Sequence, residues 1–162
     1  MVREAKTWMG FLLAATGIFA VTGSLAAADD PPISGVFKGN GKEAKLAYLS
    51  ASKGEPFADK PTIVLIFTEK DHSKDKKPDF NAVFGKHGSA LIIKIYEDGK
   101  IVGCQVVHTA LKQSGFSSVG TIKMSDFKLE NGKIQGKLST GGEDEFFGDK
   151  WEVNLKFQAK AP

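Results

Sequence analysis

Apolar and polar residues alternate along most of the chain after residue 30, which is the pattern of β-strands. The segment KWEVNLKFQAK is the clearest example, because Trp151, Val153, Leu155, Phe157 and Ala159 share one face and the polar residues between them share the other. One face of this strand therefore packs against a core and the other meets water.

Glycine-containing turn sequences separate the alternating runs. Asp98-Gly99 and Asn131-Gly132 each stand between two such runs, as does Gly39-Asn40-Gly41. These residues tolerate the positive φ that tight hairpin turns require. The apolar run 61–67 suits a strand covered on both faces. Together the patterns predict about eight strands, near residues 33–38, 42–50, 61–68, 89–97, 100–108, 119–130, 133–140 and 150–159.

An all-β chain with hairpin connections predicts either a β-sandwich or a closed up-and-down barrel. Long, unequal loops expected at 51–60, 69–88 and 109–118 favour the sandwich, with mostly antiparallel strands. Short helical turns are expected within 80–86 and 108–115.

The strand near 119–130 changes phase along its length. Ile122 and Met124 are apolar at even positions, whereas Phe127 and Leu129 are apolar at odd ones. One extra residue near Ser125-Asp126 reconciles the two halves, so a β-bulge is predicted there.

The N-terminal segment predicts export. A basic start with Arg3 and Lys6 is followed by an apolar run from Trp8 to Val21 and by small residues that end at Ala28. This order is typical of a secretory signal peptide, and the run is shorter than the roughly 20 residues of a membrane span. We expect residues 1–28 to be cleaved, which leaves one β-domain at 29–162, periplasmic or extracellular and without a membrane span. The alternative is an uncleaved anchor.

Charge and cysteine content exclude some classes of function. The formal net charge is +3, and no arginine follows the N-terminal segment. Arginine is the side chain best suited to phosphate and base contacts, so a nucleic-acid partner is not expected. Cys104 is the only cysteine, so no disulfide can form within the chain.

The hairpin at 89–108 places its residues in a definite register. A turn at Asp98-Gly99 sets Cys104 opposite Ile93 and Leu91 opposite Val106 on one apolar face. We therefore expect Cys104 to be a buried and unreactive thiol.

The three histidines are candidate metal ligands. If the strands near 61–68 and 89–97 are antiparallel neighbours, His72, His87 and His108 gather at one edge of the fold, together with Glu69 and Asp71. Imidazole and carboxylate ligands suit zinc, copper or nickel. The alternative is that these histidines are ordinary residues of loops and strand ends, because scattered loop histidines are common and the spacing H-x14-H-x20-H does not by itself indicate a metal motif.

Phenylalanines in predicted loops form a second candidate site. Phe116, Phe146 and Phe147 lie near strand ends, where binding residues are often found. They are interpreted as a binding surface on the loops or as covers of the core.

No catalytic motif stands out. Neither G-x-S-x-G nor S-x-x-K is present. The leading hypothesis is an exported, non-enzymatic binding or interaction module for an unidentified protein or small molecule. The alternatives are a metal-binding protein and a small hydrolase-like enzyme.

Overall fold

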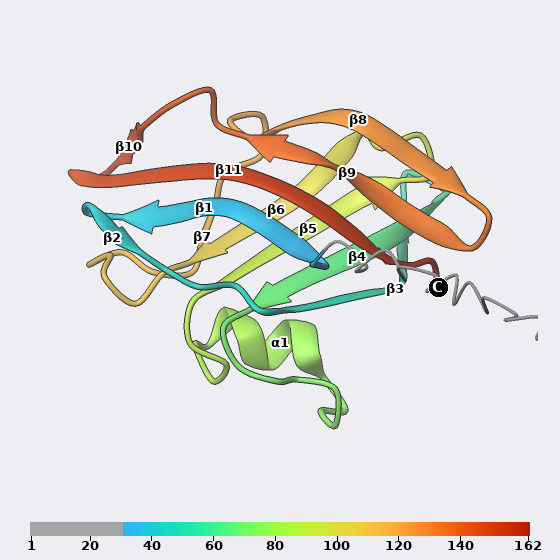
Figure 1. Ribbon diagram of the computed structural model, residues 1–162, viewed down its shortest axis with the longest axis horizontal. Coiled ribbons are helices and arrows are strands. Elements are labelled where there is room, and N and C mark those ends of the chain that lie inside the picture. Colours follow the sequence, from blue (N-terminus) through green and yellow to red (C-terminus); the bar gives the residue numbers. More distant parts are fainter. Residues whose placement is uncertain (1–30) are drawn as a thin grey trace, which may run out of the picture.

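The computed structural model describes residues 31–162, whose strands form two antiparallel sheets packed face to face (Figure 1). The fold is an all-β sandwich, so the predicted fold class is confirmed. The predicted signal peptide and its cleavage site lie outside the described residues.

The first sheet, sheet A, has the strand order β2-β1-β11-β9-β8, and β10 pairs with β11 beside this path. Its strands are β1 (Ile33–Gly39), β2 (Lys42–Glu43), β8 (Lys123–Glu130), β9 (Lys133–Ser139), β10 (Asp144–Phe146) and β11 (Asp149–Lys160).

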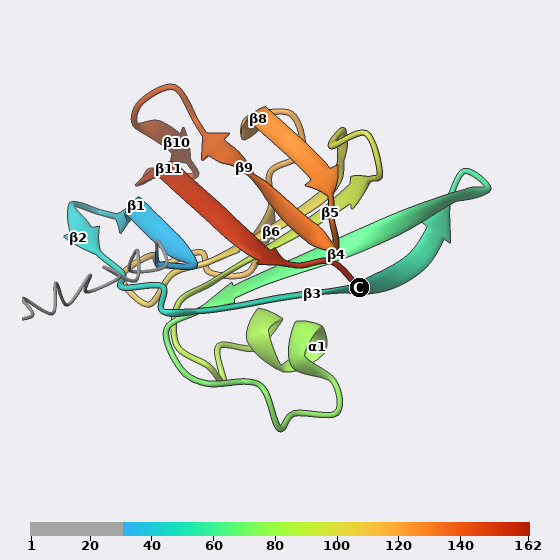
Figure 2. The same cartoon turned by 45° about the vertical axis from the view of Figure 1, so that its right-hand side comes forward.

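The second sheet, sheet B, has the order β3-β4-β5-β6-β7. Its strands are β3 (Tyr48–Phe57), β4 (Lys60–Thr68), β5 (Ala90–Tyr96), β6 (Ile101–Val107) and β7 (Phe116–Ser117). Figure 2 shows the β3–β4 hairpin reaching beyond the edge of sheet A.

The main core lies between the two sheets. Its largest fully buried side chains include Trp151, Phe37 and Phe67, and the Phe67 and Phe157 rings meet edge to face at 5.5 Å. These residues come from the inner faces of both sheets, as the period of two along β11 predicts.

A second apolar cluster covers the outer face of sheet B. The helix α1 (Pro78–Val83) sets the fully buried Ala82 against Ile66 and Ile92. This cover explains why β4 and β5 read as nearly continuous apolar runs. The helix falls in one of the two segments expected to be helical, whereas residues 108–115 form turns instead.

The hairpin register is confirmed over most of its length. Cys104 pairs with Ile93 and Leu91 with Val106. The turn itself is one residue longer than expected, since the Tyr96 N–H donates to the Lys100 carbonyl at 3.0 Å. A register shift just after Lys94 compensates for this extra residue.

The predicted β-bulge is also confirmed. The register of β8 against β9 shifts by one residue between Ser125 and Lys128. Asp126 has a φ of +51° there, in the left-handed region that extra residues often adopt.

The segment 51–60 differs from the expected loop. Most of it extends β3, which pairs with β4 from Tyr48 to Gly54. The chain reverses at Ala58 and Asp59, which have φ values of +48° and +59°. Such a turn normally carries Asn-Gly or Asp-Gly, so the sequence contains no signal for it.

Candidate functional site

The outer face of sheet A carries lysines in opposing positions on neighbouring strands. Lys137 of β9 is the direct cross-strand partner of Lys156 of β11, and Lys133 is the partner of Lys160. Side chains in such positions have Cβ atoms roughly 4.5–5.5 Å apart, and like charges there are destabilising. Two lysine pairs therefore lie in register across β9 and β11.

Polar side chains lie beside one of these lysine pairs, on the same face of the sheet. Ser34 of β1 faces Lys156 from the other side, and Gln135 faces Gln158 one step along the strands. All of these side chains point away from the core, because alternate residues of β11 and β9 are buried beneath them. Two ammonium groups, two carboxamides and a hydroxyl thus share one surface.

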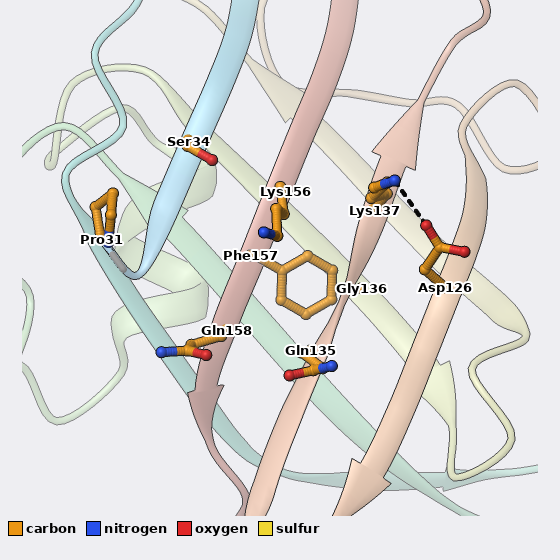
Figure 3. Close-up of a pocket in the computed structure, with 9 residues that line it drawn as sticks. All are labelled: Pro31, Ser34, Asp126, Gln135, Gly136, Lys137, Lys156, Phe157 and Gln158. Carbon is orange, nitrogen blue, oxygen red and sulfur yellow. Dashed lines mark ion pairs between the residues drawn. The ribbon is translucent and has the colours of Figure 1, made fainter. Parts of the chain in front are cut away.

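These residues line a hollow of about 560 Å³ (Figure 3). A hollow of this size matches the volume of small-molecule sites. Its lining consists of Pro31, Ser34, Asp126, Gln135, Gly136, Lys137, Lys156, Phe157 and Gln158.

The bulge in β8 adds the single acidic side chain of the hollow. The Asp126 carboxylate lies 2.7 Å from the Lys137 ammonium. The hydrogen bond and the charge of Lys137 lower the pKa of Asp126. Both side chains are more than half exposed, so this ion pair contributes little to stability. It offsets one lysine charge of the hollow.

The wider face is basic as well. The outward positions of β8, β9 and β11 from Glu152 onward carry six lysines and three acidic residues, a formal net of +3. Residues 31–162 as a whole have 20 lysines and 16 acidic residues, a net of +4. Most of the excess positive charge therefore lies on this face.

The structure brings two of the three histidines together. The rings of His72 and His87 lie 6.0 Å apart and are both buried. His108 has other neighbours, with the Phe37 ring edge-on to it at 4.9 Å. Within residues 31–162 no three histidine, cysteine or acidic side chains are arranged to hold a metal ion.

The two predicted carboxylate ligands are engaged by the backbone. Glu69 accepts a hydrogen bond from the Ser89 N–H at 2.6 Å, and Asp71 accepts one from the Ser73 N–H at 2.8 Å. The metal site remains a prediction, and zinc, copper or nickel would have to displace these contacts to form it.

His72 connects two strands of sheet B to the segment that follows β4. Its Nε2 lies 2.7 Å from the Ser50 hydroxyl of β3, and its Nδ1 lies 2.7 Å from the Thr68 hydroxyl of β4. Burial lowers the pKa of His72, and the nearby His87 lowers it further. His72 is therefore neutral at neutral pH.

His87 joins the same segment to α1. Its Nε2 lies 2.9 Å from a carboxylate oxygen of Asp75, and the Asn81 side chain donates to both oxygens of Asp75. The bonds from Asn81 and His87, with one from the Lys77 N–H, lower the pKa of Asp75 to about 2.

His108 is enclosed in the main core. Its Nδ1 accepts a hydrogen bond from the Ala110 N–H at 3.1 Å, while its buried Nε2 has no partner among the described residues. Burial lowers the pKa of His108. A side chain on Gly39 would begin 2.6 Å from Nδ1, so the ring fits only because residue 39 is glycine.

The three predicted loop phenylalanines form one cluster at the end of the sandwich. The rings of Phe116 and Phe146 stack at 4.1 Å, and Phe116 meets Trp151 edge to face. Phe147 is 83% exposed and touches Phe146 alone among these rings. Phe116 and Phe146 thus cover the core, and a binding role for the cluster remains a prediction.

Cys104 lies in the main core and forms no disulfide. Burial raises the pKa of its thiol to about 12. A thiol with so high a pKa is a poor nucleophile. This agrees with the buried thiol that the hairpin register predicts.

Sequence reasoning missed the lysine face and the serine partner of His72. The alternation of lysines with apolar residues was visible, but it places them together only when β9 and β11 are neighbours. Ser50 and Thr68 likewise meet one histidine because β3 and β4 pair.

Comparison of the chain with protein-family models, with curated proteins and with solved structures finds no match in any of the three. In residues 31–162 no helix has the length and apolar character needed to cross a membrane.

Proposed function

We propose that this chain is an exported binding module, and that its ligand is a carboxylate-bearing saccharide held, without chemical change, in the hollow on the outer face of sheet A. The observation that carries the proposal is the register that sets Lys137 directly opposite Lys156. A carboxylate bound between the two strands would be attracted by both ammonium groups, so its binding free energy would exceed that from a single lysine.

The remaining lining side chains select the class of ligand. Gln135 and Gln158 each offer a hydrogen-bond donor and an acceptor, and Ser34 offers a hydroxyl. Such groups match the hydroxyls of a sugar. Lysine is a flexible point charge without the planar fork of arginine, so each lysine can pair with a carboxylate through a single contact.

Titration calorimetry with trigalacturonate at low ionic strength tests the proposal. We expect binding that weakens as salt is added, because the lysines are exposed and their charges are screened. Neutral galactotriose should bind weakly or not at all. Replacing both lysines, in Lys137→Gln/Lys156→Gln, should weaken binding by up to about thirtyfold, from up to about 1 kcal/mol for each exposed charge contact.

Lys53→Gln is the matched control, since this lysine is exposed on β3 of the other sheet. It should bind like the wild type. Equal affinity for the charged and neutral trisaccharides, or unchanged affinity in the double variant, would contradict the proposal.

A further inference from the structure

A second site lies on the outer face of sheet B, away from the hollow. We propose that Ser50 is a nucleophile, that His72 is its general base, and that this pair hydrolyses small esters. The inference rests on hydrogen-bond directions in the chain Ser50–His72–Thr68 and is independent of the function proposed for sheet A.

The direction of each hydrogen bond follows from the Thr68 hydroxyl. This group has one proton, which it donates to the Lys70 carbonyl at 2.7 Å. In its contact with His72 Nδ1, the Thr68 oxygen must therefore be the acceptor, and the Nδ1–H of the ring must be the donor. In neutral His72 the proton then resides on Nδ1, and Nε2 is an acceptor.

The Ser50 hydroxyl consequently donates to Nε2 of His72 at 2.7 Å. This is the arrangement of an activated serine, in which a base within hydrogen-bond reach is itself oriented by a third group. The Thr68 side chain is fully buried, and its hydrogen bond orients the His72 ring.

The charges around His72 suit a base that is neutral at rest and charged during reaction. Burial and His87 lower its pKa, which keeps Nε2 free of a proton, while the carboxylates of Asp71 and Asp75 act in the opposite direction. The same carboxylates would stabilise the imidazolium once it forms.

Ser50 is placed where a substrate can approach. It is half-buried, and it lies on β3, the edge strand of sheet B. Edge strands present unpaired N–H groups, and backbone N–H groups are the kind of donor that stabilises a developing oxyanion.

The reaction balances without any further reagent. The Ser50 Oγ forms a bond to the ester carbonyl carbon while its proton moves to His72 Nε2. The bond from that carbon to the leaving oxygen then breaks, and His72 returns the proton to the leaving alcohol. Water repeats the sequence on the acyl-serine and releases the acid.

Labelling of the purified protein with a fluorophosphonate reporter tests the assignment. We expect modification of Ser50 in the segment LAYLSASK (46–53), with fragmentation separating Ser50 from Ser52. The labelling rate should be constant from pH 7 to 8, and it should fall only on stronger acidification, because burial lowers the pKa of His72 from its ordinary value of about 6.5. A serine without a base would instead react faster as the pH rises.

Variants separate catalysis from structure. His72→Gln and Thr68→Val should slow labelling, the former by about a hundredfold, whereas Thr68→Ser should restore the rate. Ser52→Ala is the matched control, because Ser52 is exposed two residues further along β3. Thermal unfolding of each variant confirms that it is folded.

Absence of labelling in the folded wild type, labelling at Ser52, or equal rates in wild type and folded Thr68→Val would overturn the proposal. His72 would then only fasten the segment after β4 to sheet B.

Discussion

Lys137 on β9 lies directly across from Lys156 on β11, in the middle of a sheet whose outer face is open to solvent. Like charges in this position destabilise a sheet. Stability would be served better by an acidic residue at either position. The Asp126 carboxylate, 2.7 Å from the Lys137 ammonium, offsets part of this repulsion.

Reversing one charge of this pair should separate stability from binding. In Lys156→Glu the cross-strand pair becomes attractive, so the free energy of unfolding should rise by about 0.5–1 kcal/mol. Trigalacturonate binding should be lost in the same variant. Urea unfolding at low and high salt measures the first effect, which should shrink at 1 M salt. A less stable variant, or a more stable one that still binds, would contradict this interpretation.

Stability should fall as the pH decreases below about 6.5, the ordinary pKa of histidine. His72 and His108 both have lowered pKa values in the folded protein. The unfolded chain therefore binds protons first on acidification, which favours unfolding. The loss begins at the unfolded pKa and levels off once the folded pKa is passed. Urea unfolding from pH 7.5 to 4.5 measures the slope, and His72→Gln should make it shallower.

The Asp75 carboxylate should hold the segment after β4 in place. In Asp75→Asn, the bonds from Asn81 and His87 to a charged acceptor are lost. We expect faster amide exchange within 70–88 and little change in the sheets. Asp79→Asn is the control, since Asp79 is exposed on α1. Because the pKa of Asp75 is lowered to about 2, the stabilisation is present above the ordinary pKa of 3.8 and is lost as the pH falls towards 2.

Two adjacent phenylalanines should respond differently to substitution. Phe146→Ala removes a ring stacked on Phe116, and it should lower the free energy of unfolding by about 1–2 kcal/mol, through the lost ring contact and the lost burial. Phe147→Ser changes a ring that is 83% exposed and should change stability by less than about 0.5 kcal/mol. Chemical denaturation compares them, and equal losses would show that Phe147 also packs.

Cys104 should be unreactive in the folded protein. Its buried thiol has a pKa of about 12, so little thiolate is present at pH 8. A disulfide reagent such as Ellman's should give no colour with the native protein and one equivalent in guanidinium chloride. Rapid reaction in the native state would show that β6 opens readily.

Local patterns determined much of the fold. Alternation of period two identified the buried face of β11, and the change of phase near Asp126 located the bulge in β8. The hairpin pairing of Cys104 with Ile93 followed from a turn signal only a few residues away. Each of these features depends on neighbours in the sequence, and so it can be read without knowing the rest of the fold.

Some local structure had no signal in the sequence. The hairpin turn at Ala58-Asp59 lacks the glycine and asparagine that mark such turns. The short strands β7 and β10 contain two and three residues, too few to show any period. They exist because β6 and β11 offer unpaired backbone groups beside them.

The candidate sites were decided by the tertiary structure. The sequence showed lysines alternating with apolar residues, yet only the pairing of β9 with β11 sets Lys137 against Lys156. It showed three histidines, yet it could not tell that His72 meets Ser50 and Thr68 while His108 turns into the core. Strand order joins residues far apart in the chain, and alternation along one strand carries no information about which strand lies beside it.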